Sequence, residues 1–130
     1  MQLLLDTRTF LWVIRDDPRL GWRSRDLIAD QADLVLLSVA SLWQIAASAG
    51  NRPQPGALTV AQALHWAEVS GVQLLPIQPA HLIALEQLPP HHHNPVDRLL
   101  LAQAIHTPLV LMSANGALRP YGCLLVDPRR

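Results

Sequence analysis

The chain has 130 residues, half of them apolar, and its ten cationic side chains balance ten acidic ones. This length and apolar content suit one domain, residues 1–130, with a sizeable core. No apolar run is long enough to span a membrane. The balanced charge gives no overall attraction to nucleic acid, although every cation is arginine, which binds phosphate in a bidentate manner. The single cysteine, Cys123, excludes a disulfide framework, and the start lacks a basic leader, so we expect a cytoplasmic protein.

Short apolar runs alternate along the chain with segments of helical spacing. In chain order these predict a strand at residues 3–5, helices at 7–14 and 19–30, a strand at 34–37, helices at 41–49 and 59–69, a strand at 72–77, helices at 79–87 and 95–106, and strands at 109–112 and 124–126. Several of the strands are continuously apolar, which is typical of strands buried on both faces. The alternation predicts an open parallel sheet with helices on both faces. Proline and glycine mark residues 50–56 and 88–95 as loops.

Asp6 follows the first predicted strand, at the edge where open parallel sheets bind ligands. Its side chain could cap the next helix, although Thr7 could do this equally well. Other polar residues follow the second and fourth strands and should share that edge, namely Ser38, Ser41, Gln44, Ser113 and Asn115. The sequence therefore predicts a polar site there.

Asp97 lies in the middle of the apolar stripe of the helix at 95–106, among Leu100, Leu101, Ala104 and Ile105. A buried carboxylate needs a partner or a cation. Asn94 is a predicted N-cap that places Asp97 in the first turn, where a carboxylate is favourable. We expect Asp6 and Asp97 to meet at one acidic site. On the opposite side of this helix the pattern places Arg98, Ala102, Gln103 and His106.

The remaining chemistry-bearing residues form no recognised motif. His91, His92 and His93 are consecutive, whereas metal ligands are usually spaced, so we expect a solvated loop. The four tryptophans suit core or subunit packing, and Trp22, next to Arg23, could face a partner protein. There is no glycine-rich phosphate loop and no nucleophile elbow. Carboxylates holding a divalent cation are the strongest chemistry that remains.

Several segments together resemble the PIN domain, and specifically the VapC-type toxins of bacterial toxin–antitoxin pairs. The resemblance covers nearly the whole chain. It implies a three-layer α/β/α fold around a parallel sheet of about five strands in the order 3-2-1-4-5. It also implies an acidic site for Mg²⁺ or Mn²⁺, RNA cleavage, a homodimer and a cognate antitoxin. The matching segments are Leu3-Leu4-Leu5-Asp6-Thr7, Leu11-Trp12, Asp17-Pro18-Arg19-Leu20, Ser41-Leu42-Trp43-Gln44-Ile45-Ala46, Pro89-Pro90-His91-His92, Asn94-Pro95-Val96-Asp97-Arg98-Leu99-Leu100-Leu101-Ala102-Gln103-Ala104, Ser113-Ala114-Asn115 and Tyr121-Gly122.

Asp6 and Asp97 match two acidic positions of the family. Three positions that are often acidic there carry amides in this chain, namely Gln44, Asn94 and Asn115. Each such change removes a charge pair worth roughly 4 kcal/mol at about 4 Å and an effective dielectric near 20, which weakens metal binding. The loss also relieves repulsion between the acids.

Two hypotheses follow from the resemblance. In the first, the chain is a ribonuclease whose catalytic residues are Asp6, Asp97, Gln44 and Asn115, with the metal held by the two aspartates and with the two amides orienting water or phosphate. Supporting, water-positioning roles then fall to Thr7, Ser41, Asn94 and Ser113. Phosphate contacts fall to Arg8 and Arg98, unless these two arginines form ordinary salt bridges. In the second, the chain is an impaired or inactive homologue, natural or engineered, that keeps dimerisation and antitoxin or RNA binding.

Overall fold

The protein is described by a computed structural model that covers residues 1–49 and 56–130. Residues 50–55 of the first predicted loop lie outside the described residues. Five parallel strands form one sheet in the order β3-β2-β1-β4-β5, which confirms the predicted strand order. Within the described part of the chain, no helix has the length and apolar character needed to cross a membrane.

The elements follow one another in the predicted alternation of strands and helices. They are β1 (Gln2–Leu5), α1 (Thr7–Arg15), α2 (Trp22–Asp26), the π-helical turn η1 (Leu27–Gln31), β2 (Leu34–Ser38), α3 (Val39–Ala49), α4 (Val60–Val69), β3 (Gln73–Leu75), α5 (Pro79–Glu86), α6 (Pro95–His106), β4 (Val110–Met112), the 3₁₀ helix η2 (Gly116–Tyr121) and β5 (Leu125–Val126).

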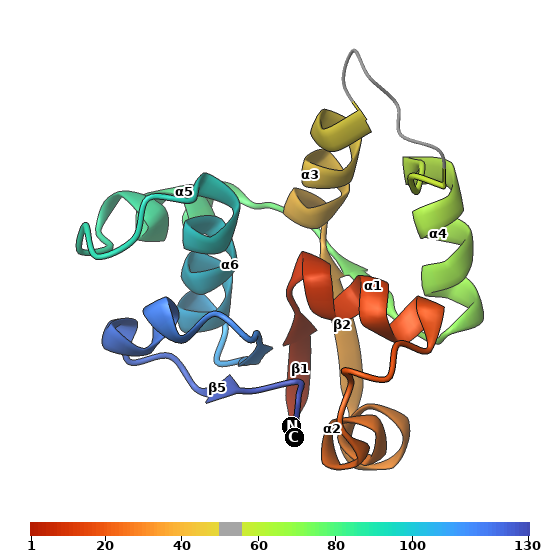
Figure 1. Ribbon diagram of the computed structural model, residues 1–130. Coiled ribbons are helices and arrows are strands. Elements are labelled where there is room, and N and C mark those ends of the chain that lie inside the picture. The colour runs from red at the N-terminus through yellow and green to blue at the C-terminus, as the bar shows by residue number, and fades with distance from the viewer. Residues whose placement is uncertain (50–55) are drawn as a thin grey trace.

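The central strand β1 is buried on both faces, as its continuous apolar run predicts. Leu3 and Leu5 pack into one core cluster with Phe10 of α1, and that cluster also contains residues of α3 and α4. Leu4 points to the other face, where it packs into a second cluster with Leu100 of α6. Figure 1 shows α5 and α6 on one side of the sheet and α1 and α4 on the other. The protein therefore has the three-layer α/β/α architecture.

The structure differs from the prediction around residues 19–30, where the sequence predicts one helix. The α-helix begins only at Trp22 and continues as the π-helical η1 to Gln31. Gly21 caps α2 without a side-chain bond, and its amide instead donates to the Pro128 carbonyl at 2.8 Å. A chain segment more than a hundred residues away thus decides where this helix begins.

The predicted division of α6 into a polar and an apolar side is wrong at three positions. Ala102 and Gln103, placed on the polar side, are fully buried, while Ile105, placed on the apolar stripe, is exposed. The reason is that α5 packs against α6, so that Gln103 is enclosed between α5 and the end of β2. Gln103 is satisfied there, because its Oε1 accepts from the Ser38 hydroxyl at 2.6 Å and its Nε2 donates to the Pro76 carbonyl at 3.3 Å.

Candidate functional site

Asp6 lies directly after β1 and caps α1. Its Oδ1 accepts from the Thr9 amide at 2.8 Å, and its own amide donates to the Met112 carbonyl of β4 at 3.1 Å. The residue is only 8% exposed. Burial raises the pKa of the Asp6 carboxyl above its usual range; hydrogen bonds from Ser113 and Thr9 partly offset this, and the nearby Asp97 carboxylate raises the pKa further. Capping and a site role therefore coexist in this side chain.

Asp97 lies in the first turn of α6, where the predicted Asn94 cap is present. Asn94 Oδ1 accepts from the amides of Val96 at 3.0 Å and of Asp97 at 3.2 Å. Asp6 and Asp97 line one pocket of about 280 Å³, together with Thr7, Arg8, Gln44, Asn94, Ala114 and Asn115. The two aspartates that are 91 positions apart in the sequence are thus brought to the same hollow at the carboxyl edge of the sheet.

Gln44 extends from α3 toward the start of α1. Its Oε1 accepts from the Thr7 hydroxyl at 2.6 Å, and that hydroxyl also lies 2.9 Å from Ser41 Oγ. Ser41 is fully buried, so it supports the pair from beneath and does not form part of the pocket wall. Because its carbonyl oxygen is bonded to Thr7, Gln44 turns its amide nitrogen away from that bond and offers a donor rather than a charged oxygen.

Asn115 has a different role from that of an oxygen ligand. Its Oδ1 accepts from the Ala117 amide at 3.1 Å and caps η2, while its Nδ2 donates to Asp97 Oδ2 at 3.3 Å. Ser113 Oγ accepts from the Asn115 amide at 3.1 Å, and its hydroxyl bonds to Asp6. Both ends of the Asn115 amide are therefore committed, and the residue orients Asp97.

His92 also bonds to Asp97, which the sequence reasoning missed. Its Nε2 lies 3.0 Å from Asp97 Oδ2, and both side chains are about one-fifth exposed. Since a carboxylate only accepts hydrogen bonds, Nε2 is the donor. The sequence pattern does not distinguish His92 from His91 and His93, because consecutive loop positions show no periodicity. The only sequence signal is that it precedes the capped start of α6 by a few residues.

The two arginines proposed as phosphate contacts have different surroundings. Arg8 is exposed and lines the acidic pocket. Arg98 points elsewhere, because its guanidinium donates to the carbonyls of the 85–92 segment and approaches the Tyr121 hydroxyl at 3.3 Å. Arg98 therefore holds the loop before α6, and it forms no salt bridge with a described carboxylate.

The donor set of the pocket fits a weakly held hard cation. Within residues 1–49 and 56–130, no group of three His, Cys, Asp or Glu side chains is placed to hold a metal ion. Mg²⁺, however, keeps several waters and is often bound by only one or two carboxylates together with substrate phosphates. Asp6 and Asp97 meet that lower requirement. The residues therefore fit a cation that depends on water and substrate for most of its ligands.

The sequence matches the PIN domain family over residues 3–121, and the chain therefore belongs to this family. Its fold is similar to that of a chain in the VapBC2 complex of Rickettsia felis bound to promoter DNA, with a TM-score of 0.72 at 14% identity, covering 97% of this chain and 98% of that one. The VapBC-1 structure from nontypeable Haemophilus influenzae gives 0.69 at 14% identity over 100% of both chains. FitAcB from Neisseria gonorrhoeae gives 0.64 at 15% identity over 97% of both chains. None of the curated proteins matches the sequence.

Proposed function

We propose that this chain is the toxin of a toxin–antitoxin pair and a ribonuclease that uses Mg²⁺ or Mn²⁺. The observation that carries the proposal is the convergence of Asp6 and Asp97 on one pocket at the carboxyl edge of the sheet. Membership of the PIN family and the fold shared with chains of toxin–antitoxin complexes support it. We further propose a cytoplasmic location and a homodimer, for which the exposed Trp43 and Trp66 offer apolar surface.

The proposed roles follow from the geometry of each side chain. Asp6 and Asp97 would hold the cation, which activates water and neutralises charge on the phosphate when it is bound. Asn115 and His92 fix Asp97 by donating to its Oδ2. Gln44 is placed to donate to a water or a phosphate oxygen. The guanidinium of Arg8, which has no partner among the described residues, is placed to bind an adjacent phosphate.

A second candidate function is a non-catalytic binding protein that keeps the antitoxin interface. The observation that favours it is the composition of the pocket, where Gln44, Asn94 and Asn115 stand beside only two carboxylates. The two remaining carboxylates could still accept a cationic side chain from a partner. The two functions differ in whether the pocket binds a metal tightly enough for chemistry.

Calorimetric titration with Mn²⁺ and an assay on a labelled tRNA pool separate the two. A ribonuclease requires metal binding at or below millimolar concentration and cleavage that Asp6→Asn abolishes. If the chain neither binds Mn²⁺ nor cleaves RNA at millimolar Mn²⁺, the enzymatic proposal is overturned and the binding-protein proposal remains. Asp30→Asn on the exposed part of η1 is the matched control, because it removes one charge far from the pocket.

Gln44→Glu provides the complementary gain-of-function test. One carboxylate oxygen can keep the bond from Thr7, and the other adds a negative charge to the pocket. We expect Mn²⁺ affinity to rise about tenfold, a conservative fraction of the charge-pair energy, and cleavage to rise with it. An unchanged affinity would mean that position 44 does not face the cation.

A further inference from the structure

The arginines of this chain fall into two groups according to their partners. Nine of the ten lie in the described residues. Four of these are engaged: Arg19 with Asp17, Arg25 with Asp16, Arg129 with Asp127, and Arg98 with loop carbonyls. The other five have no side-chain hydrogen bond or ion pair with any described residue, namely Arg8, Arg15, Arg23, Arg119 and Arg130.

The same division appears in where the side chains lie. Every arginine of the unengaged group lines a surface hollow, and none of the four engaged arginines lines one of the hollows at or beside the acidic pocket. Arginine heads held in solvent-filled hollows without a carboxylate partner are placed to bind anions. The neutral net charge of the chain therefore conceals an uneven distribution of charge.

These hollows flank the acidic pocket on both sides. On the α1–α3 side, a hollow of about 300 Å³ contains Arg8 and Arg15 and shares Thr7, Arg8 and Gln44 with the acidic pocket. None of the described residues that line it is acidic. A phosphate chain leaving the acidic pocket in this direction would meet two unpaired guanidinium groups.

On the other side, a hollow of about 480 Å³ contains Arg119 and Arg130. It includes Ser113 and Gly116, the residues on either side of the Ala114–Asn115 pair that lines the acidic pocket. Asp127, the one acid among the described residues that line it, is already paired with Arg129. This hollow therefore also has a surplus of positive charge.

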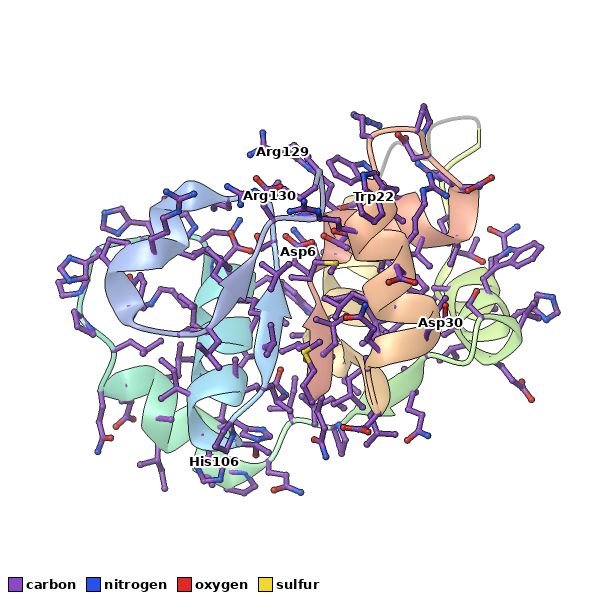
Figure 2. All side chains as sticks on the ribbon, turned by 90° about the horizontal axis from the view of Figure 1, so that it is seen from below. Asp6, Trp22, Asp30, His106, Arg129 and Arg130 are labelled. Atoms are coloured by element: carbon purple, nitrogen blue, oxygen red, sulfur yellow. The ribbon has the colours of Figure 1, made fainter. Side chains whose placement is uncertain are left out.

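A third hollow of about 400 Å³ extends the second one toward α2. It shares Arg130 and Val126 with the second hollow and adds Arg23 and Trp22, together with Asp26, which accepts a hydrogen bond from Gln31. Trp22 is 72% exposed, and Figure 2 shows it beside Arg130, on the opposite side of the molecule from His106. An exposed indole beside cationic side chains is the arrangement on which unpaired bases stack.

We propose that these five arginines, the flanking arginines, bind the backbone phosphates of single-stranded RNA on both sides of the acidic pocket, with Trp22 stacking a base at one end. This inference rests on the proposed function, whose substrate path it defines. Single-stranded RNA is the occupant that matches both features, because phosphates meet the guanidinium groups and an unpaired base meets the indole. An acidic protein segment would need the charges but not the exposed ring.

The test compares two double variants with the same change in net charge. Arg15→Gln with Arg119→Gln removes one flanking arginine on each side, and Arg19→Gln with Arg25→Gln removes two engaged ones that line none of these hollows. Binding of labelled oligouridylate is measured in EDTA over a range of KCl concentrations. For single strands the slope of log affinity against log salt falls by about 0.7 for each phosphate that the protein no longer neutralises. We expect the slope to fall by about 1.4 in the flanking variant, where two phosphates are freed, and to stay unchanged in the control.

The inference is overturned if the wild-type chain does not bind oligouridylate, or if the two double variants give equal slopes. It is also overturned if polyglutamate displaces labelled oligouridylate as well as unlabelled oligouridylate does, because the surface would then fit an acidic protein. Trp22→Ala should weaken binding to oligouridylate but not to an abasic strand, and Ile83→Ala, which removes another exposed apolar side chain, is the control. Binding is measured in EDTA and therefore does not depend on the metal. If RNA binds in EDTA but is not cleaved in Mn²⁺, the inference stands and the proposed enzymatic function fails. If RNA is cleaved in Mn²⁺ but the two double variants bind it equally, the inference fails and the enzymatic function stands.

Discussion

Asp97 offers only one of its carboxylate oxygens to the pocket. Both of its side-chain donors, His92 Nε2 and Asn115 Nδ2, bind the same atom, Oδ2. Oδ1 has no hydrogen-bond partner among the described residues and is left for a cation or water. An aspartate at position 115 could not donate this bond and would place a second negative charge beside Asp97. The amide at 115 is therefore consistent with its neighbours, and the pocket is adapted to two acids.

His92→Ala tests whether this orientation matters for metal binding. Partners that orient a ligand typically contribute 10–100-fold to metal affinity, so we expect Mn²⁺ affinity to fall about tenfold by calorimetry. His92→Gln, which keeps a donor, should recover much of the loss. The exposed neighbour His93→Ala is the control and should bind like wild type. Equal affinity in His92→Ala and wild type would show that Asn115 alone holds Asp97.

Asp6 is predicted to reduce stability at neutral pH. Its raised pKa means that the folded state holds the proton more tightly than the unfolded chain, so stability falls as pH rises from the ordinary aspartate value of 3.8 through the folded pKa. Asn keeps the cap on α1, because it is as good an N-cap as Asp. We expect Asp6→Asn to be more stable than wild type by roughly 1 kcal/mol at pH 7, with the difference closing toward pH 3, in urea unfolding. A variant less stable than wild type at pH 7 would contradict this.

At the scale of elements, most of the strands and helices were predicted from apolar runs and from helix caps. The runs around β1, β2 and β4 predicted buried parallel strands, and the Asn94-Pro95 pair predicted the start of α6, because these signals are local. The polar side of α6 was predicted wrongly because packing by α5 is a tertiary event. The 3₁₀ helix η2 was not predicted at all, since its Asn115 cap is a single polar residue within a short loop.

The sequence predicted part of the candidate site, as it predicted part of the fold. Strand ends and the apolar stripe identified Asp6 and Asp97, because both are departures from a periodic pattern. The hydrogen-bond partners of the side-chain amides could not be predicted from the sequence pattern. Asn115 and Gln44 look like free donors and acceptors in the sequence, and only the fold shows that Ala117 and Thr7 occupy their oxygens. His92 required the same information.

At the scale of the whole molecule, the segment after β5 joins the sheet edge to α2. Figure 1 shows this segment leaving β5 and passing in front of β1 on its way to the end marked C. The Pro128 carbonyl accepts from the Gly21 amide at 2.8 Å, and the Arg130 carbonyl accepts from the Ser24 amide at 2.9 Å. These bonds satisfy the amides of the N-cap Gly21 and of Ser24 in the first turn of α2, where no side chain of the described residues caps the helix. They also hold Trp22 and Arg130 in the same hollow.

Gly21→Ala tests this junction, because a methyl group at position 21 would overlap the Arg130 carbonyl. The neighbour is backbone and cannot rotate away, so the segment after β5 must shift. Overpacking of this kind typically costs 1–3 kcal/mol, and we expect about 2 kcal/mol in urea unfolding, with faster hydrogen exchange at the Ser24 amide. Gly116→Ala is the matched control, since nothing lies within 4 Å of the added carbon. If the two variants unfold at the same urea concentration, the junction does not fix α2. If only Gly21→Ala is destabilised and oligouridylate binding weakens with it, the junction also positions the end of the proposed RNA path.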